Sequence, residues 1–193
     1  MTDTKKPRRV VILGAAGRDF HNFNMLYRGD PETVVVAFTA TQIPGIAARR
    51  YPAALAGLRY PDGIPVVDLA ELEALCRRER VDAVMFAYSD VTHAEVMHQA
   101  SRALAAGADF LLAGPAAPMI GMAKPVIAVS AVRTGCGKSQ TARHLARHLR
   151  LGNRRVAVLR HPMPYGDLAR QTVQRFASRA DLEAANCTIE ERE

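Results

Sequence analysis

Cysteine is scarce in this chain: its 193 residues include three, at positions 76, 136 and 187. Their spacing matches neither a disulfide framework nor a zinc site, so the sequence favours a reducing cytosol. Long hydrophobic runs are also lacking. The basic N-terminus leads into only four apolar residues, too few for a signal peptide, and no later run approaches the length of a membrane span. We therefore expect a cytoplasmic protein with no membrane partner.

Aromatic residues are missing from the most basic segment, although the whole chain carries a net charge of +7 and a pI near 9.8. The arginines of this segment fall on one predicted helix and its exit, at positions 143, 147, 150, 154 and 155. Without interleaved aromatics they do not form a stacking platform for single-stranded nucleic acid. The charge also fits an ordinary basic surface or an anionic metabolite. We expect a phosphorylated small-molecule substrate rather than nucleic acid, and homo-oligomerisation stays open.

The first 123 residues alternate short apolar runs with amphipathic segments, as strands and helices do in an α/β protein. Asp68 and Thr92 each have an acidic residue three positions later and predict helix starts, and Gly107 predicts the end of the second helix near Ala106. The predicted strands cover residues 10–13, 33–39, 81–88 and 110–113. Right-handed crossovers between such strands give a parallel sheet, so residues 1–123 are predicted to form a Rossmann-like, doubly wound domain.

Residues 124–193 predict the start of a P-loop NTPase domain. A Gly- and Pro-containing break precedes a predicted strand at 126–131, a loop, a helix from about 139 to 151, and a strand at 155–159. Two strands are too few for a covered open sheet, and no apolar strand ending in Asp follows to help hold magnesium. We expect this domain to be incomplete and the chain to be the N-terminal part of a longer protein.

The loop between that strand and helix carries two glycines, a lysine and a hydroxyl. In a phosphate loop, glycines let backbone N–H groups converge on phosphate oxygens at a helix N-terminus, lysine reaches the terminal phosphates, and the hydroxyl holds magnesium. Val132 replaces the first glycine of the usual pattern; in the longer loop of dethiobiotin-synthetase-like ATPases, Ala131 replaces it. The predicted contacts to ATP, or alternatively GTP, are Thr134, Gly135, Cys136, Gly137, Lys138, Ser139 and Gln140, with Ser139 on Mg²⁺. A tight turn with an incidental lysine is the alternative.

A second glycine loop, residues 14–20, lies where a dinucleotide fingerprint belongs. Phe20 replaces the third glycine, and the second strand ends in Thr39-Ala40-Thr41 without the acidic residue that binds the ribose hydroxyls. NAD is therefore not favoured. The polar side chains after this turn predict a site for another anionic ligand, formed by Arg18, Asp19, His21 and Asn24. Helix capping and turn bonding by Asp19 and Asn22 is the equal alternative.

Two more polar clusters follow predicted strands, at the sheet edge where open α/β folds bind ligands. Ser89 and Asp90 follow the strand at 81–88, although helix capping explains them as well. Arg160, His161 and Tyr165 follow the strand at 155–159. His93 and His98 are five residues apart, a poor spacing for sharing a metal on one helix.

Taken together, four segments resemble the cyclic 2,3-diphosphoglycerate synthetase family, whose bacterial relatives are often described as GTPases. These segments are residues 14–24, 87–90, 131–139 and 160–167. The resemblance covers nearly the whole chain and implies ATP-dependent, magnesium-assisted closure of an intramolecular phosphoanhydride in 2,3-diphosphoglycerate. It implies that Lys138 holds the β- and γ-phosphates, while Arg133, Arg160 and His161 clamp the substrate or the transferring phosphoryl group. The implied second-ligand residues are Arg18, Asp19, His21, Asn24, Ser89, Asp90 and Tyr165.

Two other functional classes stay open at this stage. One is a nucleotide-hydrolysing switch or metallochaperone-like GTPase, in which turnover drives a partner protein. The other is a non-catalytic module that binds nucleotide without turning it over, since the magnesium carboxylate is missing from these residues.

Overall fold

The computed structural model describes residues 6–40, 49–88, 91–132, 135–160 and 167–185. Contacts divide the chain into two compact units. The first unit comprises Met1–Ile120 with Pro164–Thr172, and the second comprises Gly121–Met163 with Val173–Glu193.

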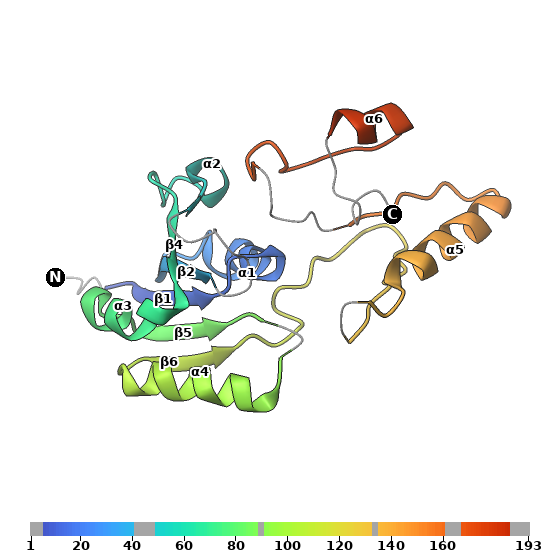
Figure 1. Ribbon diagram of the computed structural model, residues 1–193. Helices are drawn as coiled ribbons and strands as arrows, with labels where there is room; N and C mark the ends of the chain where they lie inside the picture. The colour runs from blue at the N-terminus through green and yellow to red at the C-terminus, as the bar shows by residue number, and fades with distance from the viewer. Residues whose placement is uncertain (1–5, 41–48, 89–90, 133–134, 161–166, 186–193) are drawn as a thin grey trace. The chain divides into compact units, whose positions relative to one another are not determined.

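The first unit is built on a six-stranded sheet with the order β3-β4-β2-β1-β5-β6 (Figure 1). Neighbouring strands pair in parallel, except for β3 and β4, which are antiparallel. The strands are β1 Arg8–Leu13, β2 Thr33–Ala40, β3 Arg50–Tyr51, β4 Ile64–Asp68, β5 Ala83–Phe86 and β6 Asp109–Leu112. The chain first moves outward from β1 through β2 to β4, and then continues on the other side of β1 with β5 and β6. This reversal is the topological switch of a doubly wound fold, and it confirms the Rossmann-like prediction.

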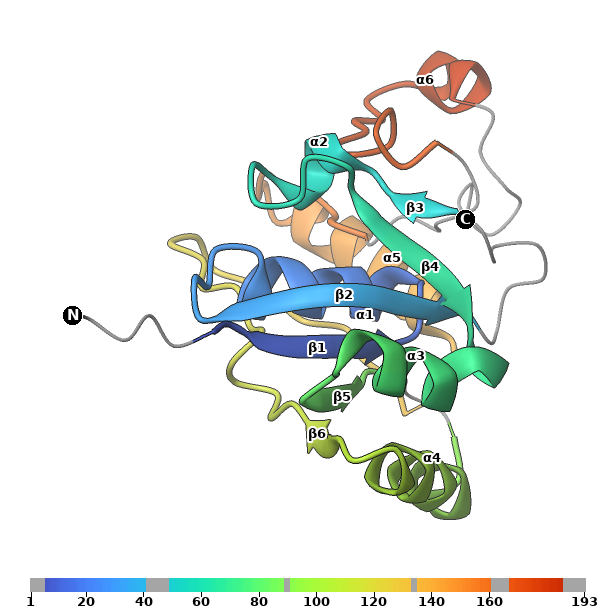
Figure 2. The same cartoon turned by 90° about the vertical axis from the view of Figure 1, so that its left-hand side faces the viewer.

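Helices cover both faces of this sheet, with α3 and α4 on one side and α1 on the other (Figure 2). Alternate residues of β1 divide between the two cores: Val10 and Ile12 join one, and Val11 and Leu13 join the other. The elements are α1 Gly17–Asn22, the π-helix η1 Phe23–Tyr27, α2 Ala53–Ala56, the 3₁₀-helix η2 Leu69–Glu71, α3 Leu72–Glu79 and α4 His93–Ala105. Since both faces of the central strands are buried, Val10–Leu13 of β1 and all of β5 are apolar, as the sequence predicted.

Side-chain caps begin the two helical segments that the sequence predicted. The Asp68 carboxylate accepts the N–H of Ala70 at 2.8 Å, and the Thr92 hydroxyl accepts the N–H of Glu95 at 3.2 Å. The strand β4 was missed because its five residues include Pro65 and show no long apolar run. The two-residue strand β3 was missed as well, since so short a segment leaves no periodic signal.

An aromatic cluster packs α1 and η1 against the sheet. Phe20, which stands where a dinucleotide fold has its third glycine, is 6% exposed. Its ring centroid lies 5.0 Å from that of Phe38 and 4.6 Å from that of Tyr51. Phe23 contacts the same two rings and also Tyr60. The ring of Phe20 therefore belongs to the core that holds the helix after the first strand.

The second unit contains the helices α5 Lys138–Leu151 and α6 Arg179–Ala184. The helix predicted at about 139–151 is confirmed by α5, but the strands predicted at 126–131 and 155–159 are wrong, because both segments lack strand structure. Apolar side chains in these segments are exposed, with Ile127 at 61% and Leu159 at 83%. A strand needs a neighbour for its backbone N–H and C=O groups, and the described part of this unit provides none. A P-loop domain begins with a strand, a loop and a helix. Here the described residues form the helix but not the strand.

No helix in the described ranges combines the length and apolar character that crossing a membrane requires.

Candidate functional site

The candidate nucleotide loop, of which residues 135–137 are described, lies directly before α5. Gly135 and Gly137 have φ angles of +81° and +83°, in the left-handed region that favours glycine. Gly137 is the N-cap of α5, and Lys138 is the first helical residue. The N–H groups of a first helical turn have no partner within the helix and carry the positive end of the helix dipole. The backbone geometry therefore suits an anion at this end of α5.

Side chains of the candidate nucleotide loop differ in exposure. Lys138, Gln140 and Cys136 are exposed, whereas Ser139 is half-buried. The hydroxyl of Thr141 donates to the carbonyl of Gly137 at 3.1 Å and holds the loop against the first turn of the helix. Thr141 was not predicted from the sequence because it lies after the phosphate-loop motif. Its hydroxyl, four residues after the capping glycine, is the signal that could have identified it.

Several predicted site residues lie outside the described ranges: Arg133, Thr134, His161 and Tyr165 in the second half of the chain, and Ser89 and Asp90 in the first. Arg160 is described and exposed. The proposed catalytic roles of Arg133, Arg160 and His161 stay predictions.

The other glycine loop follows β1 and leads into α1. Gly14 has a φ of +117°, and a Cβ atom at this position would lie 2.4 Å from Cγ of Asp19. Any side chain here would therefore clash with the carboxyl group as well as strain the backbone. Gly14 is required by the position of Asp19.

Asp19 is a buried carboxyl group, 2% exposed, at the beginning of α1. Its Oδ2 accepts the N–H of Ala16 at 2.7 Å, which caps the helix. Burial raises the pKa of Asp19 to about 7, although the Ala16 N–H and the charge of Arg18 act in the opposite direction. The capping role that the sequence allowed for Asp19 is confirmed.

Thr39 and Tyr88 extend this polar cluster across the ends of β2 and β5. The Gly14 N–H donates to Oγ1 of Thr39 at 3.1 Å, and Thr39 is fully buried. A side-chain hydrogen bond links Thr39 to Tyr88, whose pKa is raised by burial. In the sequence, Thr39 was notable only because it lies at the end of the second strand, where a dinucleotide fold has an acidic residue. In the fold, the N–H groups of Ala16 and Gly14 donate to Asp19 and Thr39, so these two amides of the glycine loop are paired with the protein's own side chains.

His21 and Asn24 make contacts within the first unit. The Nε2–H of His21 donates to the carbonyl of Pro118 at 2.6 Å. The side-chain amide of Asn24 donates to the Tyr51 hydroxyl at 3.1 Å. These contacts tie α1 and η1 to neighbouring segments of the chain. Among the predicted second-ligand residues, Arg18 lines a cavity.

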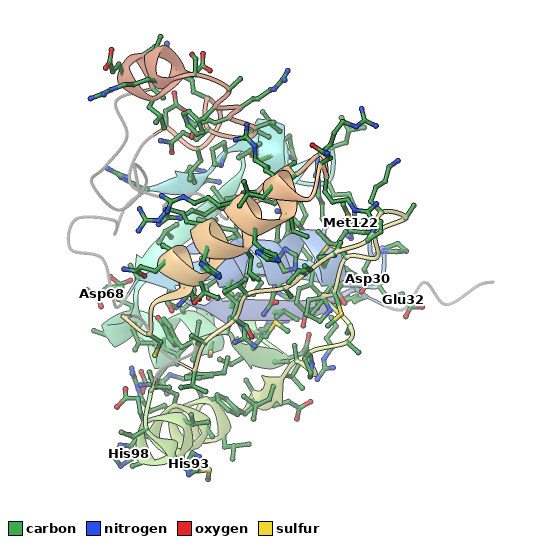
Figure 3. All side chains as sticks on the ribbon, turned by 90° about the vertical axis from the view of Figure 1, so that its right-hand side faces the viewer. Asp30, Glu32, Asp68, His93, His98 and Met122 are labelled. Carbon is green, nitrogen blue, oxygen red and sulfur yellow. The ribbon has the colours of Figure 1, made fainter. Side chains whose placement is uncertain are left out.

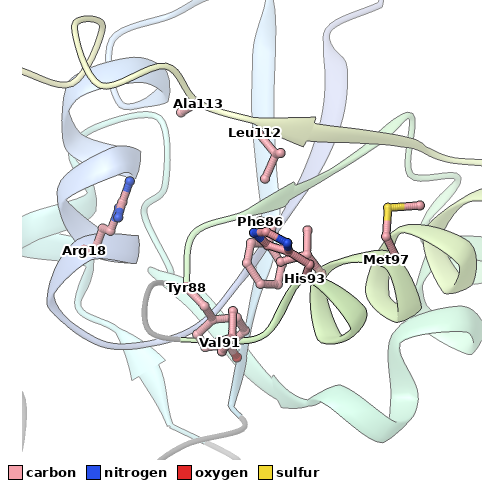
Figure 4. Close-up of a pocket in the computed structure, with 9 residues that line it drawn as sticks. Arg18, Phe86, Tyr88, Val91, His93, Met97, Leu112 and Ala113 are labelled. Atoms are coloured by element: carbon pink, nitrogen blue, oxygen red, sulfur yellow. The ribbon is translucent and has the colours of Figure 1, made fainter. Parts of the chain in front are cut away.

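That cavity, of about 400 Å³, lies at the ends of β5 and β6 beside α1 and α4 (Figure 4). Arg18 stands at one end of the row of lining residues and Met97 at the other (Figure 4). His93 also lines it, and both His93 and His98 project from the outer part of α4 (Figure 3). The lining residues are Arg18, Phe86, Tyr88, Val91, His93, Val96, Met97, Leu112 and Ala113.

Comparison with known proteins gives one close likeness in sequence. No protein-family model matches the chain. Over 189 residues it is 59% identical to arginine synthetase ArcE of Thermococcus kodakarensis. The alignment covers 98% of this chain and 42% of that relative, so the chain spans less than half the length of the relative it matches. The likeness supports a relationship to a synthetase, without showing the cyclic 2,3-diphosphoglycerate family that the motifs resemble.

Solved structures give weaker likenesses. The Rex-family repressor RSP, in a complex with β-NADH, has a TM-score of 0.44 at 13% identity, covering 77% of this chain and 64% of its own. KijD10, a 3-ketoreductase from Actinomadura kijaniata solved with TDP-benzene and NADP, has a TM-score of 0.39 at 25% identity, covering 74% and 36%. The assignment of the Rossmann-like fold rests on the strand order.

Proposed function

We propose that this chain serves an ATP-dependent synthetase and that the loop before α5 binds the nucleotide. The observation that carries the proposal is the 59% identity to arginine synthetase ArcE across nearly the whole chain. A synthetase couples formation of a bond to cleavage of a nucleoside triphosphate. The loop before α5 combines two left-handed glycines, a lysine and a hydroxyl at a helix N-terminus, which suits the phosphates of such a nucleotide.

Each loop residue has a separate role in this proposal. The backbone at Gly135 and Gly137 contacts the phosphates, because no Cβ atom blocks their approach. Lys138 neutralises charge on the terminal phosphates, and the Ser139 hydroxyl provides one ligand to Mg²⁺, which stabilises charge during phosphoryl transfer. Arg133, Arg160 and His161 are proposed to bind the second substrate or the transferred phosphoryl group.

The product that we propose first is arginine, since the relative named for that product aligns with 98% of the chain. Closure of the phosphoanhydride in 2,3-diphosphoglycerate is the second candidate, favoured by the glycine loops and the segment at 160–167. Both reactions belong to nucleotide-driven bond formation and need cations around the phosphates. They differ in the second substrate, which the candidate nucleotide loop does not select.

Nucleotide binding is tested by calorimetry of the 193-residue chain with Mg·ATP and Mg·GTP. We expect Lys138→Ala to weaken Mg·ATP binding about tenfold or more, because it removes a charge-assisted contact to phosphate. Lys124→Ala removes an exposed lysine of the second unit outside the motif and serves as the matched control. Equal affinities for the wild type and Lys138→Ala would contradict the assignment of the loop.

The reaction is tested in a chimera, in which this chain replaces the 189 matching residues of the T. kodakarensis relative. We expect arginine synthetase activity that needs ATP and is abolished by Lys138→Ala. A chimera that instead releases phosphate only with 2,3-diphosphoglycerate would favour the second candidate. Full activity with Lys138→Ala would contradict a role of this lysine in either reaction.

A further inference from the structure

The lining of the cavity at the ends of β5 and β6 comes entirely from the first unit and includes no residue of the proposed nucleotide loop. Its residues come from α1, the β5 end, α4 and the β6 end, so four parts of the fold converge on it. In open α/β sheets, ligands bind outside the carboxyl ends of the strands, near the reversal of strand order. Here the reversal lies between β1 and β5, and the cavity is next to β5.

A dinucleotide is a poor occupant of this edge of the sheet. The Ala16 N–H donates to buried Asp19, and the Gly14 N–H donates to buried Thr39. A pyrophosphate bound on this loop would lose those two donors and would approach the carboxyl group of Asp19. The Asp19 carboxyl group also lies directly against Gly14 and occupies space that a phosphate would need. The ligand of the cavity must therefore be bound by groups other than the glycine-loop amides.

The described lining of the cavity has a long apolar part and one permanently charged group. Phe86, Val96, Met97 and Leu112 provide the apolar part, and the side chain of Leu112 is exposed at the end of β6. Arg18 provides the charge, from the exposed side of α1. Its guanidinium has the planar set of donors that matches a carboxylate. A cavity of about 400 Å³ lies in the range for small-molecule sites and accommodates a ligand of one ring with a short chain.

The titratable groups near Arg18 do not neutralise its positive charge. Asp19, the next residue of α1, interacts electrostatically with Arg18, and its raised pKa weakens its negative charge near pH 7. His93 and Tyr88 face the cavity from α4 and the segment after β5, and Glu95 acts on Tyr88 from a distance.

We propose that this cavity binds a small organic carboxylate with an apolar body, its carboxylate on Arg18 and its body against Phe86, Met97 and Leu112. None of the residues of this site belongs to the loop before α5, so its binding is tested separately from nucleotide binding. The ligand is thus bound by the first unit alone, although the glycine loop of this unit departs from the dinucleotide fingerprint.

The test uses the ¹³C-labelled methyl groups of the seven methionines in the 193-residue chain, with the Met97 signal assigned from Met97→Leu. The probe is 3-phenylpropionate, and 3-phenylpropionamide is the neutral probe of the same shape. We expect the carboxylate to shift the Met97 signal saturably, with a dissociation constant of roughly millimolar order for so small a ligand. The amide should bind about tenfold more weakly, because it lacks the charge-assisted contact.

Arg18→Gln identifies the group that recognises the carboxylate. We expect this variant to weaken 3-phenylpropionate about tenfold and to remove its preference over the amide, while Arg77→Gln, an exposed arginine on α3, leaves both unchanged. Arg18 is exposed, and the unchanged methyl signal of buried Met85 will show that the variant is folded. Equal binding of the two probes, an unaltered affinity in Arg18→Gln, or no shift at Met97 would overturn the proposal.

Discussion

Asp19 shows how one residue determines what the first glycine loop does. Its carboxyl group lies against Gly14 and accepts the N–H of Ala16, so it takes part of the space and one of the donors that a phosphate would use. Phe20, the next residue, fills the position of the third fingerprint glycine and packs on Phe38 and Tyr51. These two neighbours replace the groups that recognise a dinucleotide with a helix cap and a core side chain.

Burial of Asp19 predicts a pH-dependent stability. Its pKa rises from 3.8 to about 7 in the fold, so folding favours the neutral form. The stabilisation is fully present below pH 3.8 and is lost as the pH rises through about 7. With about 1.4 kcal/mol per pKa unit, this loss reaches up to roughly 4 kcal/mol. We expect Asp19→Asn to remove the corresponding fall in the free energy of unfolding, measured by urea denaturation at a series of pH values.

Asp62→Asn is the control for this prediction, since Asp62 is exposed. The control should keep the wild-type pH profile. If Asp19→Asn also keeps it, the carboxyl group of Asp19 does not titrate as its burial implies.

At the scale of elements, a bidentate ion pair joins α3, η2 and α4. Arg102 contacts the two carboxylate oxygens of Glu73 at 2.5 and 2.8 Å, and it also donates to the carbonyl of Leu69 at 2.9 Å. The hydrogen bonds from Arg102 lower the pKa of Glu73 to about 2. The pair is partly shielded, with both side chains about 30% exposed. It therefore fixes how α4 lies against α3 more firmly than a pair in open solvent would.

Replacing Arg102 by Lys keeps the charge but loses the planar pair of donors. We expect Arg102→Lys to lower the free energy of unfolding by about 1 kcal/mol at pH 7. This difference should shrink as the pH falls from 4.5 toward about 2, because protonation of Glu73 removes the pair in the wild type. Urea denaturation measures both effects, with Arg78→Lys on the exposed face of α3 as the matched change. A loss that is the same at both ends of this pH range would show that packing, rather than the ion pair, causes it.

At the scale of the whole molecule, the two units differ in how much of their structure is buried. Four of the six residues of β1 and all four residues of β5 are buried, whereas α5 has no buried residue. Amides open with a free energy that follows local burial and packing. We expect backbone amides of β1 and β5 to exchange with deuterium about 100-fold or more slowly than those of α5 in the ligand-free chain.

Mass spectrometry of short peptides measures this difference. Addition of Mg·ATP should slow exchange in the first turn of α5 and leave β1 unchanged, if the proposed nucleotide loop is correct. Equal protection of α5 and β1 without nucleotide would contradict the contrast in burial.

Local signals predicted the elements whose causes lie within a few residues. Apolar runs flanked by charge or glycine gave β1, β2 and the centre of β5, and the caps at Asp68 and Thr92 gave the starts of the two helical segments. The same kind of signal failed at 126–131 and 155–159, where apolar runs lack strand structure. An apolar run becomes a strand only when another strand receives its hydrogen bonds, and that partner is distant in sequence.

The sequence by itself determined the α/β class, the parallel Rossmann-like sheet, the helix at α5 and the pattern of glycines, lysine and hydroxyl before it. Each follows from periodicity, capping or a motif within a short stretch of chain. Only the tertiary structure decided that Asp19 and Thr39 take the glycine-loop amides, and that Arg18, Met97 and Leu112 line one cavity. These residues are brought together by the order of strands in the sheet and by burial, which depend on contacts between distant segments.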